Sequence, residues 1–271
     1  MNHQIFDPTP DLRPFVQCYW SLEGPRIATP TNNTIVPDGS MKLIFHYGDP
    51  YTHFPKQGGP VALPRCFLIG QLTRPFEVGP TGETGTFFVR FHPDGFLPFA
   101  PAPIRTMENA AIPLEVLFGD EGKDLEQQIM NARATPERIT VIEAFLLNRL
   151  TDAKADNFLV KASVETILKA KGQPSIDEIS NLININRRQL ERKFSAMIGL
   201  SPKQLSKIAR LQATLKLLRA KKTGSLTTLA YEGNYYDQAH FIRDFREFTG
   251  ITPKEFFGGT LDMSLIFEGE E

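Results

Sequence analysis

Two stretches near the C-terminus carry hydrogen-bonding side chains at the spacing of helix turns. The first contains Arg188, Glu191 and Arg192, and the second contains Gln238 and Arg243. An arginine can donate two bonds to guanine, a glutamine can pair with adenine, and a glutamate can accept a bond from cytosine. Side chains three or four positions apart share one face of a helix. The chemistry open to these residues is therefore the reading of base edges in a groove of DNA.

Both stretches belong to a repeated pattern, found at residues 179–202 and again at 230–253. The same interval separates four pairs of identical residues: Arg192 and Arg243, Phe194 and Phe245, Gly199 and Gly250, and Pro202 and Pro253. A repeat with fixed spacing implies a duplicated supersecondary unit. Each unit must place its polar side chains on one exposed face.

The first copy predicts two helices joined by a short break. Ser175 and Glu178 form the sequence pattern of a capping box, which begins the first helix. Asn186 can cap the second helix, and Gly199 ends it. The buried stripe of this second helix consists of Leu190, Phe194 and Met197 or Ile198.

The second copy predicts the same arrangement. Residues 226–230 mark its first helix, Gly233 and Asn234 the turn, and Asp237 the cap of its second helix. The buried stripe is Phe241, Phe245 and Phe248. Helix, tight turn and a helix with a basic outer face are typical of a DNA-reading helix-turn-helix. The candidate DNA-binding residues are Asn186, Arg187, Arg188, Glu191, Arg192, Gln238, Ala239, Ile242, Arg243 and Arg246.

A long helix is predicted between the two copies. Ser201 caps it, Pro202 takes its first position, and leucine and isoleucine recur at helical spacing until Thr223 and Gly224. About 20 residues give about 30 Å of helix, close to the roughly 34 Å of one DNA turn. One chain could thus enter two successive major grooves. Lys203, Lys207 and Arg210 on this helix suit phosphate contacts or plain surface better than base reading.

Residues 160–258 resemble the C-terminal domain of the AraC/XylS family of bacterial transcription regulators. The resemblance rests on R-K-F-x4-G-L-S-P at 192–202 and on Y-Y-D-Q-A-H-F-I-R-D-F-R-E-F-T-G-I-T-P at 235–253. It implies double-stranded DNA as a partner and base-reading residues on the faces named above. The sequence departs from the family at Asn234, where a glycine is usual. Asparagine tolerates a left-handed turn, so we expect the turn to be kept.

Charge is unevenly distributed along the 271 residues. Residues 157–259 hold 17 Lys and Arg against 9 Asp and Glu, a balance of +8, although the whole chain has a net charge of −1. A basic C-terminal part supports a polyanionic partner for that part alone. The chain has no signal-like N-terminus and no apolar run of about 18 residues, so we expect a cytoplasmic protein. Cys18 and Cys66 match no metal or redox spacing and are interpreted as reduced structural residues.

The first half of the chain predicts a small β-barrel or sandwich followed by helices, which gives the whole chain an α+β fold. Strands are expected at 15–22, 42–47, 66–70 and 86–92. Phe87, Val89 and Phe91 should face one side of the last strand and Phe88, Arg90 and His92 the other. Helices are expected at 114–118, 123–131 and 136–150, the last capped by Thr135 with Pro136 in its first position, and residues 151–157 read as a linker.

This half also resembles, less specifically, the cupin-like sensory or accessory domains that precede AraC-type domains. The similar residues are Y-W-S-L at 19–22, V-P-D-G at 36–39, L-I-G-Q at 68–71 and V-R-F-H-P-D-G at 89–95. The resemblance implies binding of an effector or dimerisation. Candidate effector-binding residues are Trp20, His46, Phe88 and Arg90. For Trp20 the alternative is a place in the core, and for Arg90 a pair with an acidic neighbour.

Enzymatic chemistry has no positive support in the sequence. His46, His53 and His92 could converge in a barrel, but they show no ligand spacing with a carboxylate or cysteine. No nucleophile elbow, P-loop or dinucleotide fingerprint appears. We therefore expect no catalytic residue, no metal and no cofactor.

Two classes of function remain open. The first is a sequence-specific DNA-binding transcription regulator, controlled by a small-molecule effector or by dimerisation, with RNA polymerase as an implied partner and no membrane association. A monomer is sterically sufficient, and a homodimer stays open. The alternative is a metal-dependent enzyme or binding protein in the N-terminal barrel, localised on DNA by the C-terminal domain. The predicted boundaries are 1–155 for the N-terminal domain, 156–259 for the DNA-binding domain and 260–271 for an acidic tail.

Overall fold

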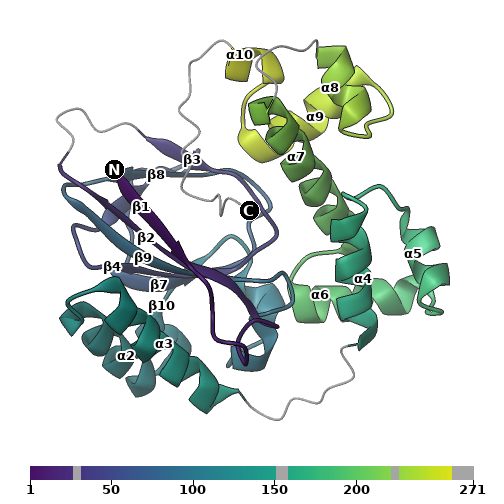
Figure 1. Ribbon diagram of the computed structural model, residues 1–271. Coiled ribbons are helices and arrows are strands. Elements are labelled where there is room, and N and C mark those ends of the chain that lie inside the picture. Colours follow the sequence, from purple (N-terminus) through teal and green to yellow (C-terminus); the bar gives the residue numbers. More distant parts are fainter. Residues whose placement is uncertain (27–31, 151–157, 221–225, 258–271) are drawn as a thin grey trace.

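The computed structural model describes residues 1–26, 32–150, 158–220 and 226–257 (Figure 1). The predicted linker at 151–157, the acidic tail at 260–271 and the expected end of the long helix at Thr223 and Gly224 lie outside the described residues. A β-rich N-terminal part is followed by a helical C-terminal part, which confirms the predicted α+β class.

The N-terminal part is built on two antiparallel sheets. The larger has the strand order β1 (Asn2–Phe6), β2 (Val16–Gly24), β9 (Thr84–Phe91), β4 (Lys42–His46), β7 (Cys66–Ile69) and β10 (Ala111–Pro113). The smaller has the order β3 (Asn33–Ile35), β8 (Phe76–Pro80), β5 (Tyr51–His53) and β6 (Val61–Ala62). Neither sheet closes on itself, so the fold is an open sandwich. The four predicted strands are confirmed as β2, β4, β7 and β9, and the other six were not predicted.

Alternation along the central strands separates two hydrophobic cores. Leu43 pairs with Val89 and Phe45 with Phe87 on one face of the larger sheet, and all four pack against helices. On the other face Ile44 pairs with Phe88, and both pack against the smaller sheet. This confirms the predicted facing of β9, because successive side chains of a strand point to opposite faces.

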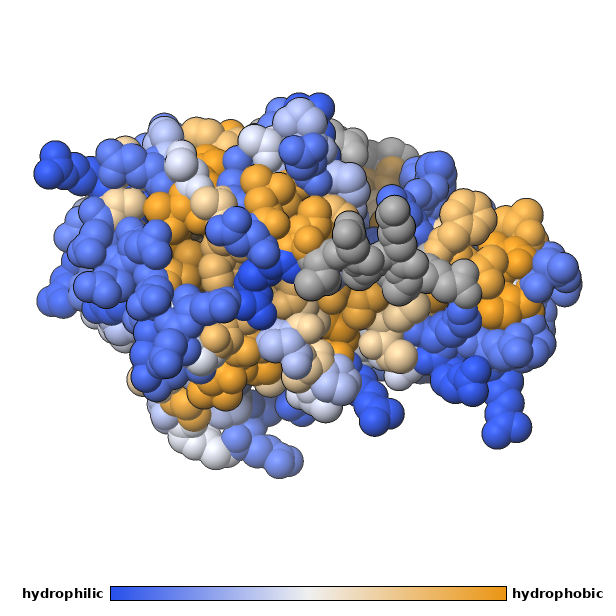
Figure 2. All heavy atoms as spheres, turned by 90° about the horizontal axis from the view of Figure 1, so that it is seen from below, coloured by the Kyte–Doolittle hydropathy of each residue, from blue (hydrophilic) through white to orange (hydrophobic). Residues whose placement is uncertain are grey.

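Three helices cover the outer face of the larger sheet (Figure 1). They are α1 (Leu114–Phe118), α2 (Asp120–Asn131) and α3 (Thr135–Arg149). Figure 2 views the molecule from this side and shows hydrophilic side chains along the outer edge with hydrophobic ones among them. The predicted cap of α3 is wrong. The cap position belongs to Ala134 and Thr135 is already helical, while the carboxylate of Glu137 accepts the Arg133 N–H at this end.

The C-terminal part consists of seven helices among the described residues. They are α4 (Phe158–Lys169), α5 (Ile176–Leu182), α6 (Arg187–Ile198), α7 (Pro202–Ala220), α8 (Leu226–Glu232), α9 (Gln238–Thr249) and α10 (Pro253–Phe257). A common core joins them, and Val36 of the N-terminal part is buried in it. Two short 3₁₀ helices, η1 (Leu97–Phe99) and η2 (Ile104–Met107), precede α1, and η2 packs on α6. Both 3₁₀ helices, α4 and α10 were not predicted.

The two cysteines are buried and unbridged, as predicted. Burial raises the pKa of the Cys18 thiol, and it also raises that of Cys66. Neither is therefore a ready thiolate nucleophile. Within the described ranges, no helix has the length and apolar character needed to cross a bilayer.

Close approach at the end of β7 predicts a large effect of one methyl group. A Cβ atom placed on Gly70 would lie 1.7 Å from the Met107 carbonyl oxygen, whereas nothing lies within 4 Å of a Cβ on Gly59. We expect Gly70→Ala to lower the free energy of unfolding by about 1–3 kcal/mol, because η2 must move away. Gly59→Ala should stay within about 0.5 kcal/mol of the unmodified protein. Urea unfolding of both variants checks this, and equal effects would contradict it.

Candidate functional site

The first reading unit consists of α5, a tight turn and α6. Ser175 and Glu178 form the predicted capping box at the start of α5. Asn184 has a φ of 52° and turns the chain. The Asn186 Oδ1 then accepts the Gln189 N–H at 2.9 Å, which caps α6. These local interactions set the direction in which α6 leaves the turn.

The two faces of α6 differ sharply. Leu190, Phe194 and Ile198 are each 0% exposed. The predicted base-reading residues of this unit are all exposed: Asn186, Arg187, Arg188, Glu191 and Arg192. Arg187 is engaged by Glu191, with an Nε–Oε1 distance of 3.0 Å. Arg188 and Arg192 form no ion pair with another described residue, which suits them to bond a nucleic acid.

The second reading unit repeats this design. Asn234 takes a φ of 58°, so the predicted left-handed turn is kept without glycine. The Asp237 Oδ1 accepts the His240 N–H at 2.7 Å and caps α9, as predicted. The aromatic stripe Phe241, Phe245 and Phe248 is buried. Gln238, Ala239, Arg243 and Arg246 are exposed and Ile242 is half-buried, and the last four line a shallow hollow on this face.

The two units differ by one residue that the sequence reasoning missed. Up to the turn, equivalent positions are 50 apart: the Ile185 N–H bonds the Ser180 carbonyl, and the Tyr235 N–H bonds the Ala230 carbonyl. From the helix caps onward, equivalent positions are 51 apart. The added residue is Tyr236, which is 89% exposed at the start of α9. An alignment of the two repeats on Asn184 and Asn234, instead of on Arg192 and Arg243, would have revealed the added residue.

Two cations of the connecting helix α7 are structural. Lys207 Nζ lies 3.1 Å from Asp244 Oδ1 and 2.7 Å from Glu247 Oε2, which fixes α9 to α7. Arg210 donates to the Gly172 carbonyl at 2.8 Å and lies over the Tyr235 ring. The interpretation of Lys207 and Arg210 as plain surface is therefore wrong, and their contact with phosphate stays a prediction.

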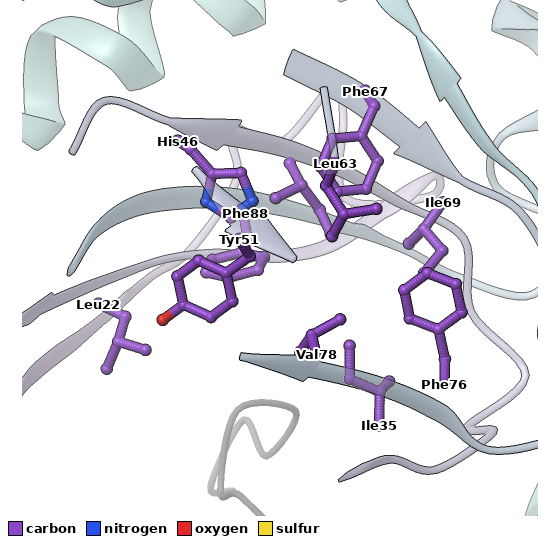
Figure 3. Close-up of a pocket in the computed structure, with 11 residues that line it drawn as sticks. Leu22, Ile35, His46, Tyr51, Leu63, Phe67, Ile69, Phe76, Val78 and Phe88 are labelled. Carbon is purple, nitrogen blue, oxygen red and sulfur yellow. The ribbon is translucent and has the colours of Figure 1, made fainter. Parts of the chain in front are cut away.

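A small cavity lies between the two sheets (Figure 3). Its volume is about 20 Å³, and its lining is almost wholly apolar. Space of this size holds about one water molecule. The His46 ring faces it: Nδ1 lies 3.0 Å from Thr86 Oγ1, and Nε2 is buried without a hydrogen-bond partner. Burial lowers the pKa of His46 to about 4, helped by the charge of Arg65, so the ring is neutral at pH 7.

The structure brings together two of the four predicted effector residues. His46 and Phe88 line the cavity. Trp20 stacks on Phe88 with ring centroids 3.7 Å apart and is a core residue. Arg90 lies elsewhere, 2.9 Å from the buried carboxylate of Asp38. The structural alternatives for Trp20 and Arg90 are thus the ones observed.

Asp38 is the centre of a buried charged cluster. Its carboxylate accepts the Lys42 ammonium at 2.9 Å and both the backbone N–H and the hydroxyl of Ser40. Burial alone would raise the pKa of Asp38, but the charges of Lys42 and Arg90 outweigh it and lower the pKa to about 2. The Asp38 carboxylate is therefore ionised over the whole physiological range, whereas burial lowers the pKa of the Lys42 ammonium to about 8.

The three histidines considered as metal ligands are not assembled into a site. His53 stacks on Phe76 and contacts the Glu77 carbonyl. His92 Nε2 contacts the Arg13 carbonyl. Among the described residues, no group of three or more His, Cys, Asp or Glu side chains is placed to hold a metal ion.

Comparison with protein families divides the chain in two. Residues 179–258 match a family described as a helix-turn-helix domain. Residues 4–113 match a domain family of unknown function, DUF6597. The first match covers both reading units except the start of α5, and the second covers both sheets except the start of β1.

Curated relatives match about a third of the chain. The transcriptional regulator GbdR of Pseudomonas aeruginosa is 31% identical over 85 residues, which are 30% of this chain and 22% of GbdR. An uncharacterised helix-turn-helix regulator of Haemophilus influenzae is 26% identical over 104 residues, 38% of this chain and 35% of the relative. The chain thus spans about a fifth to a third of the length of these proteins.

Among solved structures, ToxT of Vibrio cholerae aligns with 89% of this chain and 98% of its own, at 12% identity and a TM-score of 0.47. A probable AraC family regulator of Rhodopseudomonas palustris aligns with 37% of this chain and 94% of its own, at 29% identity and a TM-score of 0.33.

The buried His46 predicts an acid-sensitive stability. The pKa of His46 in the folded protein, about 4, lies below the ordinary value near 6.5. The contribution of the neutral His46 to the free energy of unfolding is therefore fully present above pH 6.5 and is lost as the pH falls through 4. The loss amounts to about 3 kcal/mol. We expect His46→Leu to lack this part of the pH dependence, measured as the difference in unfolding free energy between pH 7.5 and pH 4. The exposed His3→Gln should retain it. An unchanged pH dependence in His46→Leu would contradict the assignment.

Proposed function

We propose that the chain is a sequence-specific DNA-binding transcription regulator of the AraC type, because residues 179–258 match a helix-turn-helix family. One observation carries the proposal. Two capped reading helices, α6 and α9, bury an apolar stripe and expose the opposite face, and they lie at the two ends of α7 (Figure 1). The 19 residues of α7 span about 29 Å at 1.5 Å per residue. One turn of DNA measures roughly 34 Å, so both helices can enter neighbouring major grooves.

The proposed base contacts follow from exposure and chemistry. Arg188 and Arg192 of α6 and Arg243 of α9 can each bond a guanine through two N–H groups. Gln238 suits adenine, and the exposed edge of Ile242 suits a thymine methyl group. In the same proposal Glu191 accepts from cytosine or holds Arg187 in place, Ala239 allows close approach, and Arg246 contacts the duplex near the end of α9. Asn186 and Asp237 act as caps, which place the first N–H groups of each helix near phosphates.

The N-terminal part is proposed to be the regulatory domain, with boundaries 1–155, and the DNA-binding domain to span 156–259, followed by the acidic tail 260–271. An effector acting on the cavity beside His46 and Phe88 would be uncharged and largely apolar, because the lining offers one neutral imidazole, the phenol of Tyr51 and otherwise hydrocarbon. With a volume of about 20 Å³, the two sheets must separate to admit it. Separation of the sheets would then shift Trp20, which stacks on Phe88, and Arg90, which lies on the same strand β9.

Further partners are part of the same proposal. A regulator of bacterial transcription acts in the cytoplasm, where RNA polymerase is the machinery it must influence. A homodimer is compatible with the exposed surface of α2 and α3, although one chain already holds two reading helices. We assign the chain no enzymatic step. Metal binding by purified protein through His46, His53 or His92 would favour the alternative of an enzyme localised on DNA.

Loss of two arginines tests the proposal. A duplex is first selected from randomised DNA with the full chain, and binding is then measured against salt. Arg192→Ala with Arg243→Ala should each cost about 1–3 kcal/mol of specific binding, and the two effects should nearly add because the residues lie on different helices. Affinity should fall steeply as salt rises.

A double variant of equal charge serves as the control. Arg26→Ala with Arg133→Ala removes two exposed arginines of the N-terminal part. It should retain the affinity of the unmodified chain for the selected duplex within about threefold. Unchanged affinity in Arg192→Ala with Arg243→Ala, or an equal loss in both double variants, would refute the assigned reading faces.

A further inference from the structure

Residues 36–40, called the docking loop below, join the N-terminal part to the connecting helix α7. Val36 is buried in the core of the C-terminal part together with Ile208. Gln212 Nε2 donates to the Pro37 carbonyl at 2.8 Å. A Cβ atom placed on Gly39 would lie 2.8 Å from Leu205 Cδ1. The loop is therefore packed against α7 by hydrophobic contact and directed by a hydrogen bond.

The docking loop is also anchored in the larger sheet. Asp38 binds Lys42 of β4 and Arg90 of β9, and these two residues are direct partners in the β4–β9 ladder. From the side, Gln71 Nε2 donates to the Gly39 carbonyl at 3.0 Å. Three of the four motifs that resemble a sensory domain thus meet at this loop. Any displacement of β4 against β9 must move it.

The N-terminal part touches each reading helix at an equivalent point. α6 ends at Gly199 and α9 ends at Gly250, both in the left-handed conformation. A Cβ atom on Gly199 would lie 2.9 Å from Ile104 Cγ2. One on Gly250 would lie 3.4 Å from Pro75 Cγ and 3.5 Å from Lys56 Nζ. The N-terminal part therefore contacts both reading helices and the helix that joins them.

These contacts leave the reading faces open. Arg188, Arg192 and Arg243 are exposed while the docking loop lies on α7. Regulation at this interface does not work by covering the DNA-binding surface. What the interface can control is the separation and relative orientation of α6 and α9.

We propose that the N-terminal part is a gauge that fixes the spacing at which the two reading helices meet DNA, and that release of the docking loop relaxes this spacing. The inference rests on the proposed DNA-reading function and names its regulation. Two linked binding units have the highest effective concentration at the one site geometry that their linkage fits. When the docking loop holds α6 and α9 at a fixed separation, the protein therefore discriminates between site spacings. When the loop is released, the discrimination is weaker.

The test compares the unmodified full chain with Gly39→Ala plus Gln212→Ala. The alanine methyl pushes against Leu205, and the second change removes the hydrogen bond to Pro37. The matched control is Gly58→Ala plus Gln127→Ala. Gly58 also has a positive φ, of 92°, but nothing lies within 4 Å of a Cβ placed there, and Gln127 is exposed on α2.

Docking is measured first, without DNA. Spin labels on cysteines introduced at exposed Asp124 and Gln173 report the distance between the two parts, since Cys18 and Cys66 are buried. We expect a narrow distance distribution in the unmodified chain and in the control, and a broad one in the docking-loop variant. Equal distributions in all three would overturn the proposal at the level of the interface.

DNA binding is then measured on the selected duplex and on duplexes whose two recognised blocks are moved together or apart by one or two base pairs. The unmodified chain and the control should lose about tenfold or more in affinity when the spacing changes, and the docking-loop variant about threefold or less. If the docking-loop variant shows a broadened distance distribution but keeps the original preference for one spacing, the proposed control of spacing by the N-terminal part is refuted. Failure of the unmodified chain to select any DNA sequence refutes the proposed function instead, while the label measurement still reports on docking.

Discussion

The arrangement of the two parts depends on the interactions of the buried Asp38 carboxylate. It neutralises Lys42 and Arg90 inside the protein and orders Ser40, so that the docking loop has one conformation. Removing one member of such a cluster leaves an uncompensated buried charge, which typically costs about 3–5 kcal/mol. In this protein the Asp38 cluster also positions the docking loop, and Val36 of that loop is packed into the core around α7.

Local chemistry decided which elements could be predicted. The caps Ser175, Asn186 and Asp237 and the positive φ of Asn234 all follow from side chains that bond or tolerate their own backbone. The four predicted strands are largely apolar runs that lie inside the larger sheet and are buried on both faces. Among the strands that were missed, β1 and β6 lie at sheet edges with almost all of their side chains exposed, so they carry no clear apolar pattern. The open sandwich depends on long-range pairing that no local pattern encodes.

The candidate site was predictable in part for the same reason. The exposed faces of α6 and α9 are what remains once Phe194 and Phe245 are assigned to the core. Lys207 and Arg210 were misjudged because their partners come from α9 and from the turn after α4, distant in sequence. The predicted effector residues divide likewise. The alternation of side chains along β4 and β9 predicts that His46 and Phe88 lie on the same side of the sheet. The ion pair of Arg90 could not be predicted, because it depends on where the loop that carries Asp38 folds back.

The added residue Tyr236 makes the two duplicated units chemically unlike at the tip that approaches a groove. A duplex read by two unlike heads on one chain is not equivalent to its own inverted copy. Under the proposed function, the bound protein would therefore have a polarity along the DNA, with one face of the N-terminal part always turned toward the same end of the site. The exposed faces of α6 and α9 already differ, as Glu191 and Gln238 show, and Tyr236 adds a large aromatic side chain to that difference.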